Sequence, residues 1–137
     1  KSCRNFTLNF MNDIYHLDLL DEARNPNNFG DLETPDFVST NYNASCGDVI
    51  TVSVKLSKDK KKIQDIKWKG QGCVISQASM SVLSQRIIGS EIVKIQQLSQ
   101  KEILQDLGLD KISVGRIKCL LLGLTAVRKL LNKLEAK

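Results

Sequence analysis

The sequence of 137 residues has little of what marks several protein classes. Its two prolines and eight glycines are too few for a collagen-like or linker-rich chain. Aromatic residues make up only 5% of it, whereas stacking of nucleic-acid bases needs exposed rings along a basic track. The longest uncharged run, residues 70–85, is rich in Ser and Gln, which excludes a transmembrane helix. We therefore expect no nucleic-acid partner and no membrane partner.

A secretory signal is also missing, because the first apolar stretch carries Asp13 and Asp18. No Cys-x-x-Cys pair occurs, which excludes a zinc finger or a thioredoxin-type motif. We therefore expect a cytoplasmic protein whose thiols stay reduced. The length and a hydrophobic content of 42% predict a single domain over residues 1–137, with residues 1–8 as a frayed terminus.

The net charge is 20 − 15 = +5, and it is unevenly placed. Residues 1–36 hold three basic and seven acidic groups, whereas residues 37–137 hold 17 basic and eight acidic ones, an excess of 17 − 8 = +9. Such an excess is compatible with nucleic acid, an anionic surface or an acidic protein partner. We favour the simpler interpretation, a solvated surface that is rich in lysine.

The hydrophobic residues change their period along the chain. Residues 9–24 show helical spacing, and a loop over residues 25–35 follows them. Alternation then predicts three strands, and helical spacing returns after Cys73. The expected strands are 37–42, 49–56 and 63–69, and the expected helices are 74–88, 90–97, one from a Ser99 capping box to near Gly108, and 115–135. These elements predict an α+β fold, a small three-stranded antiparallel sheet with helices packed on one face.

Two cysteines are expected to lie close together although they are 73 − 46 = 27 positions apart. Cys46 stands just before the strand 49–56, and Cys73 just after the returning strand 63–69. The start of one antiparallel strand lies beside the end of the next, so the hairpin brings the two cysteines to one edge. Cys73 also stands at the start of a helix, where the helix dipole favours an anion.

Cys119 stands near the start of the last helix, beside Arg116 and Lys118, whose charges favour a thiolate. Three thiols together with the carboxylate of Asp48 would form a soft-metal site. Such a site suits zinc, or an iron–sulfur cluster with one non-thiolate ligand. The alternative is three unrelated buried cysteines with Asp48 as a turn residue, and spacing alone does not decide between the two.

Four segments of the sequence carry a resemblance to a known family. They are Asn25-Pro26-Asn27-Asn28-Phe29-Gly30, Cys46-Gly47-Asp48-Val49, Gly70-Gln71-Gly72-Cys73 and Arg116-Ile117-Lys118-Cys119. In their order and near their spacing, over about residues 12–134, they resemble the IscU/SufU/NifU N-terminal family of iron–sulfur cluster assembly scaffold proteins. The resemblance implies the α+β scaffold fold of that family.

The resemblance further implies that Cys46, Asp48, Cys73 and Cys119 ligate a [2Fe–2S] cluster, and that they bind zinc when no cluster is present. Cys119 resembles the thiol that accepts persulfide sulfur from a cysteine desulfurase. Asp48 resembles the carboxylate that sets how easily the cluster is released. The chain would then be a non-enzymatic scaffold, a monomer or a dimer, that passes its cluster to recipient apo-proteins.

Lys118 departs from the IscU branch, which has a His before the third Cys, and the Arg-x-Lys-Cys arrangement resembles the SufU branch. The alternative function is therefore a zinc-dependent sulfur acceptor, a SufU-like sulfurtransferase. The 46-residue gap between Cys73 and Cys119 is nonetheless IscU-like. Residues 112–116 replace the Leu-Pro-Pro-Val-Lys segment that the dedicated Hsp70 chaperone recognises, so the resemblance does not imply that partner. A basic nucleic-acid-binding module with a structural zinc is the third alternative.

Four further residues are expected to stand outside the site. Cys3 matches no segment of the family and lies in the terminus that we expect to fray. His16, the single histidine, is expected on the surface of the first helix. Trp68 and Met80 are expected in the hydrophobic core.

Overall fold

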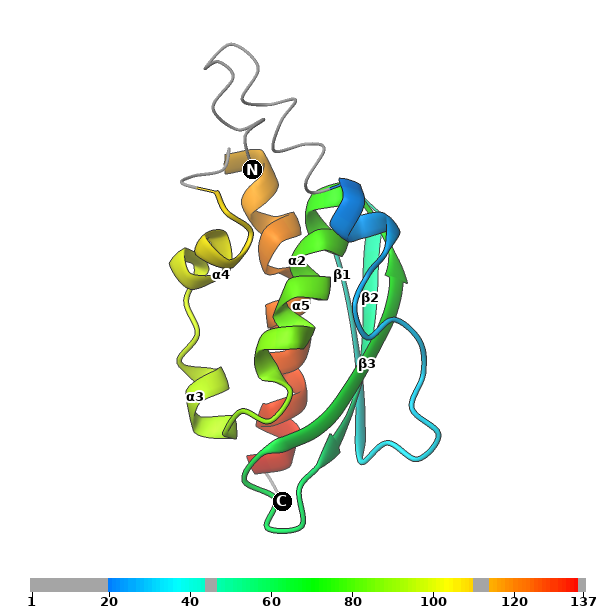
Figure 1. Cartoon of the computed structure of the whole chain (residues 1–137), viewed down its shortest axis with the longest axis vertical. Helices are drawn as coiled ribbons and strands as arrows, with labels where there is room; N and C mark the ends of the chain where they lie inside the picture. Colours follow the sequence, from blue (N-terminus) through cyan, green and yellow to red (C-terminus); the bar gives the residue numbers. More distant parts are fainter. Residues whose placement is uncertain (1–19, 44–46, 110–113, 136–137) are drawn as a thin grey trace.

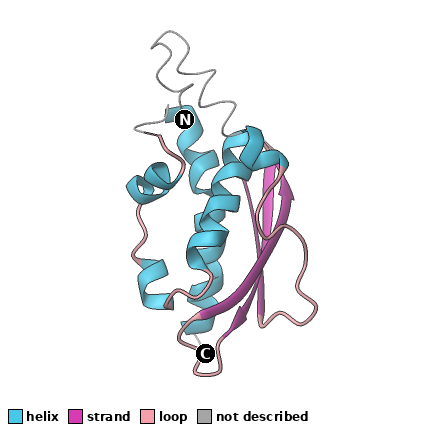
Figure 2. Cartoon of the chain, in the orientation of Figure 1, coloured by secondary structure: helices cyan, strands magenta, loops and turns pink. Residues whose placement is uncertain are grey.

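A three-stranded antiparallel sheet forms one side of the molecule (Figure 2). The structure is a computed structural model that describes residues 20–43, 47–109 and 114–135. Strands β1 (Phe37–Asn43), β2 (Asp48–Leu56) and β3 (Ile63–Gln71) lie in the order β1-β2-β3. The three predicted strands are confirmed, and each extends one or two residues beyond its predicted bounds.

The inner face of the sheet comes from the alternation seen in the sequence. Ile50, Val52 and Val54 of β2 are fully buried, whereas Thr51 and Lys55 point to the other face. Trp68 of β3 is fully buried against the same core, as predicted. The basic turn after β2 is held by its own contacts, since Asp59 accepts hydrogen bonds from Ser57 Oγ and from the backbone N–H of Lys61.

The helices α2 to α5 cover the inner face of the sheet, which confirms the predicted α+β class (Figure 1). Helices α2 and α5 pack against each other and against the strands, and α3 and α4 lie on their far side. Ser99 caps α4 by accepting the backbone N–H of Glu102, as the capping box predicts. The helices are α2 (Val74–Ile87), α3 (Ile92–Gln96), α4 (Gln100–Asp106) and α5 (Val114–Glu135), and residues 20–24 are helical as well.

Helix α2 buries several serines as well as its apolar residues, and the pattern of apolar residues alone does not predict this. The fully or almost fully buried side chains include Ser76, Ser79, Ser81 and Ser84, whereas Val74 and Val82 are only partly buried. Each buried hydroxyl makes a hydrogen bond, so the burial leaves no polar group unsatisfied there. Met80 packs in the core, as predicted.

Two of these serines fix the segment of residues 25–30 beside β3. The Ser81 hydroxyl accepts the backbone N–H of Asn27 at 2.7 Å and donates to Glu22 Oε2 at 2.6 Å. The indole N–H of Trp68 donates to the carbonyl of Asn27 at 2.8 Å, and the Phe29 ring meets the Trp68 ring edge-on. The predicted loop is therefore tied to both α2 and the sheet.

Several predictions fall outside the described residues. They concern the helix over residues 9–19, the terminus 1–8, Cys3, His16 and Cys46. Among the described residues, no helix combines the length and the apolar composition that a membrane crossing requires.

Candidate metal centre

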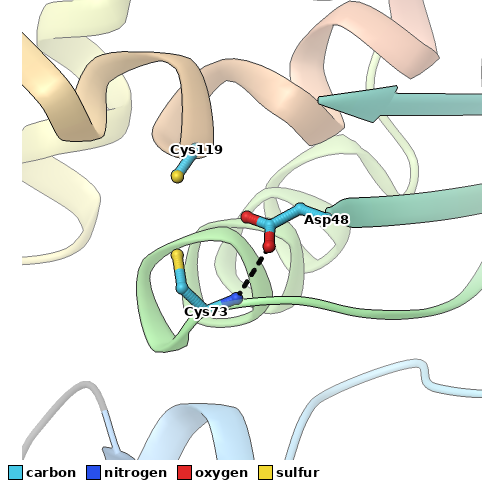
Figure 3. Close-up of side chains that lie close together, drawn as sticks. All are labelled: Asp48, Cys73 and Cys119. Carbon is cyan, nitrogen blue, oxygen red and sulfur yellow. Dashed lines mark hydrogen bonds between the residues drawn. The ribbon is translucent and has the colours of Figure 1, made fainter. Parts of the chain in front are cut away.

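Asp48, Cys73 and Cys119 meet at one end of the molecule (Figure 3). One carboxylate oxygen and the two sulfurs all lie within 4.8 Å of one another. Asp48 is the first residue of β2, Cys73 immediately precedes α2, and Cys119 lies in the second turn of α5. Three separate elements thus supply the donors, although 119 − 48 = 71 positions separate the first from the last.

The carboxylate of Asp48 is buried, with 3% of the residue exposed. Its Oδ1 accepts the backbone N–H of Cys73 at 3.2 Å (Figure 3). Its Oδ2 has no hydrogen-bond partner among the described residues. Burying a carboxylate oxygen without a partner costs free energy, and a bound cation removes that cost. The orphaned oxygen therefore fits a metal ligand better than a turn residue.

Cys73 occupies the N-cap position of α2, and its side chain makes no capping hydrogen bond to the helix. Its thiol lies 3.8 Å from Ser76 Oγ, and Ser76 Oγ donates to the carbonyl of Cys73 at 3.0 Å. The residue is half-buried and packs against the edge of the core. Its sulfur is thus held at a helix start, where the unpaired backbone N–H groups favour an anion.

Gly72 lets Asp48 and Cys73 come together. A Cβ atom at this position would lie 2.6 Å from Ser76 Oγ and 2.7 Å from Asp48 Cγ. Gly70 is needed for a similar reason, because its Cβ would meet the backbone oxygen of Val49 at 2.1 Å. Glycine at these two positions therefore permits a close approach that any larger residue would prevent.

Cys119 reaches the centre because α5 crosses both α2 and the strands. The residue is 2% exposed. The sequence pattern did not place Cys119 beside Cys73, because helical periodicity gives the face of a helix and not its position along a neighbour. Cys46 lies outside the described residues, so its part in the ligand set stays a prediction.

Arg116 is the charged neighbour of the two thiols. The pKa of its guanidinium is raised chiefly by charge attraction to Cys73, against a smaller opposing effect of burial. A hydrogen bond to Cys73 and the charge of Cys119 also raise this pKa. Arg116 is exposed and stays protonated, and it lies three positions before Cys119, a spacing that puts both residues on one helix face. Lys118 borders a hollow formed with Tyr42 and Leu121, and its expected effect on the Cys119 thiolate stays a prediction.

The donor set fits a thiophilic metal. A zinc ion holds sulfur at about 2.3 Å and carboxylate oxygen at about 2.0–2.2 Å, so two donors on one ion lie less than about 4.6 Å apart. The described donors are close to that limit already. Thiolates select zinc, copper(I) and iron–sulfur clusters, whereas calcium and magnesium prefer sites made only of oxygen.

Comparisons with known proteins point the same way. Residues 14–137 match the sequence profile of a family described as "NifU-like N terminal domain". The chain is 33% identical, over an alignment of 146 residues with its gaps, to the iron–sulfur cluster assembly scaffold protein IscU of Streptococcus pyogenes. The alignment covers 92% of this chain and 87% of that one. It is 36% identical over 112 residues to the zinc-dependent sulfurtransferase SufU of Bacillus subtilis, covering 78% and 73%.

A solved structure shares the fold. The crystal structure of a nitrogen-fixing NifU-like protein (N-terminal) from Brucella abortus matches with a TM-score of 0.76 at 24% identity. The match covers 93% of this chain and 99% of that one, so it extends over the sheet and the helices alike.

Proposed function

Because the chain belongs to the family of NifU-like N-terminal domains, we propose that it is a scaffold on which an iron–sulfur cluster is assembled. The cluster is a [2Fe–2S] cluster, built from iron and from sulfur that a cysteine desulfurase supplies, and it then passes to apo-proteins. Its ligands are Cys46, Asp48, Cys73 and Cys119. The observation that carries the proposal is the meeting of two thiols with a buried carboxylate oxygen for which the described residues offer no hydrogen-bond partner.

The mixed set of thiolate and carboxylate donors suits a cluster that has to be released to another protein. Thiolates bind iron firmly, whereas a carboxylate is a harder and weaker ligand for a thiophilic cluster. Asp48 is fixed through its Oδ1 by the backbone of Cys73, so its Oδ2 is the oxygen that remains available. The half-buried Cys73 gives a recipient protein access to one edge of the site.

Cys119 is the residue that we assign to sulfur acceptance. Its thiolate attacks the outer sulfur of the desulfurase persulfide, a new S–S bond forms on Cys119, and the desulfurase cysteine leaves as a thiolate. Cys119 is 2% exposed, so the desulfurase has to open the site before this attack. Arg116 is hydrogen-bonded to Cys119, so that contact has to break for the attack.

A zinc-dependent sulfur acceptor is the second candidate function. The position of Arg116 beside both thiols is compatible with it, because a nearby cation stabilises a site that carries several anionic ligands. The 36% identity to a zinc-dependent sulfurtransferase supports the same reading. In this case zinc is the resident ion, and it supplies the charge that keeps the ligating thiols deprotonated.

One experiment separates the two functions. The chain is purified without oxygen, and zinc, iron and acid-labile sulfide are measured before and after incubation with a desulfurase, cysteine and ferrous iron. Iron and sulfide that rise together, with a visible charge-transfer band, support the scaffold. Zinc near one ion per chain that resists replacement, with faster desulfurase turnover and no cluster, supports the sulfur acceptor.

Four single substitutions make the test specific to the site. Cys46→Ser, Cys73→Ser and Cys119→Ser should each lower the amount of cluster or zinc retained. Cys3→Ser is the matched control, and we expect it to retain as much as the unmodified chain. Unchanged reconstitution in all three site variants would exclude both functions.

A further inference from the structure

A groove runs along the edge of the sheet between β1 and α5. Two hollows form it, one of about 780 Å³ lined by residues 38–40 and one of about 280 Å³ lined by residues 41–43. The side chains of consecutive strand residues alternate between the faces of a sheet, so a hollow lined by three in a row lies at the edge of the strand. The hollows follow each other along β1, and α5 forms the opposite wall from Ile117 to Lys133. We name this feature the β1–α5 groove.

The strand that borders the groove has an open side. β1 pairs with β2 on one side, and no described strand pairs with its other side. Its side chains also leave apolar surface in solvent, since Val38 is 46% exposed and Tyr42 is 69% exposed. An edge strand with apolar side chains is a template for another extended chain, which gains main-chain hydrogen bonds and side-chain contacts there.

The opposite wall is positively charged. Lys118, Lys129 and Lys133 line the groove, and none of the described residues that line either hollow is acidic. Lys129 donates a hydrogen bond to Asn41 Oδ1 at 2.8 Å, which holds its ammonium group beside β1. The groove therefore accounts for part of the basic excess of residues 37–137, and its charge complements an acidic ligand.

The spacing of the lysines matches an extended ligand. Lys129 and Lys133 are four residues apart on α5, which corresponds to about 6 Å along a helix axis. Alternate residues of a strand, which point to the same side, are about 6.6–6.8 Å apart. A strand laid on β1 with acidic residues at every second position thus brings one carboxylate near each lysine.

We propose that the β1–α5 groove binds an extended acidic segment of a partner protein, which pairs with β1 as an additional strand and sets alternate carboxylates against Lys129 and Lys133. The groove leads to the metal centre, because Asn43 pairs with Asp48 and Lys118 directly precedes Cys119. A partner bound there is held beside the three donors without covering them. The inference goes beyond the proposed function and does not depend on which metal or cluster the site carries.

The test uses the full chain and a synthetic fluorescent peptide of alternating Glu and Val. Its affinity is measured by fluorescence anisotropy. A peptide of alternating Lys and Val is the charge control. A Glu-Val peptide with N-methylated alternate amides is the pairing control, because it cannot donate hydrogen bonds to β1. We expect the Glu-Val peptide alone to bind, with backbone amide shifts confined to residues 38–43 and to the facing side of α5.

Two double variants locate the site. Lys129→Glu with Lys133→Glu should weaken binding of the Glu-Val peptide by about tenfold or more. Lys58→Glu with Lys61→Glu makes the same change of charge in the exposed β2–β3 turn, and it should leave the affinity within about twofold. Circular dichroism melts establish that both variants fold.

Three results would overturn the proposal. The first is no binding of the Glu-Val peptide at millimolar concentration. The second is equal weakening by the two double variants, which would indicate attraction by net charge alone. The third is a concentration-dependent dimer in sedimentation that Val38→Lys abolishes, since a second copy of the chain would then occupy the groove.

Discussion

The side chain of Asp48 and the backbone of Cys73 are joined by a hydrogen bond of 3.2 Å across the end of the β2–β3 hairpin. The contact uses one oxygen of the carboxylate, and the other is buried with no hydrogen-bond partner in the part of the chain that the structure describes. It fixes the distance between two proposed ligands before any metal arrives. We therefore propose two separable roles for Asp48, a structural one through Oδ1 and a metal-binding one through Oδ2.

Asp48→Asn should separate these roles. The amide oxygen can still accept the N–H of Cys73, whereas the buried charge is lost. We expect the metal-free protein to gain about 1 kcal/mol of unfolding free energy in urea with a chelator present. Zinc affinity should fall by at least about tenfold in a competition titration, because a ligand has been lost.

Asp36→Asn is the matched control for this change. Asp36 Oδ2 also accepts a backbone N–H, that of Leu56 at 2.8 Å, but it lies away from the donors. Its zinc affinity should equal that of the unmodified chain. A loss of zinc affinity in Asp36→Asn, or none in Asp48→Asn, would contradict the assignment of Asp48 as a ligand.

Gly72→Ala should damage the metal centre more than it damages the fold. The new methyl group would push on Asp48 and Ser76, because its Cβ falls 2.6–2.8 Å from their atoms. We expect zinc affinity to fall by about tenfold or more, since displaced ligands no longer meet. Isothermal titration of the two proteins with zinc in a competing buffer measures the loss.

Gly123→Ala provides the comparison. Its Cβ would meet Met80 Sδ at 2.5 Å, inside the core. This variant should lose about 1–3 kcal/mol of stability through overpacking and keep its zinc affinity. If both glycine variants lost zinc to the same extent, the effect of Gly72→Ala would be a general loss of stability.

Arg116 and Lys118 should differ in their effect on metal binding. Zinc with several anionic ligands leaves a net negative site, and the Arg116 guanidinium lies beside its two thiols. We expect Arg116→Gln to weaken zinc binding by about threefold at low salt, and less at high salt. Lys118→Gln, which removes the same charge on the groove side of α5, should have no such effect. Equal losses in the two variants would place Lys118 at the centre as well.

Ser81→Ala tests the contacts that hold residues 25–30. It removes the acceptor of the Asn27 N–H and a donor to Glu22 in a fully buried position. We expect a loss of about 1–3 kcal/mol in urea unfolding, followed through the fluorescence of Trp68. Ser90→Ala, which removes an exposed hydroxyl bonded to the carbonyl of Arg86, should cost much less. A loss below that of Ser90→Ala would show that the segment is held by other contacts.

The part of the site that lies on the hairpin could be predicted from the sequence. Alternation from Val49 to Leu56 and a basic turn fix an antiparallel pair, and pairing then puts the region of Asp48 beside Gly72 and Cys73. The strand pairing agrees, with Val49 opposite Gln71. Trp68 and Met80 were predictable as core residues for the same reason, since each lies on an apolar face.

The position of Cys119 could not be predicted in this way. It depends on the angle and the offset at which α5 crosses α2, and these are set by how many side chains pack at once. The family resemblance, and not the spacing of the residues, indicated that Cys119 belongs with Asp48 and Cys73. The burial of Ser81 and Ser84 was missed because their partners, Asn27 and Glu22, come from a segment more than 50 positions away.

The separation of the three donors along the chain has a consequence for when a metal is taken up. Asp48 and Cys73 are 25 positions apart, and Cys119 follows 119 − 73 = 46 positions later. An unfolded chain would have to close both loops to bind one ion, and loop closure costs conformational entropy. In the folded protein the β2–β3 hairpin closes the first loop and the packing of α5 on α2 closes the second. If these residues bind the proposed metal, we expect a newly made chain to take it up only after α5 has docked, so that bound metal would distinguish folded chains from incompletely folded ones.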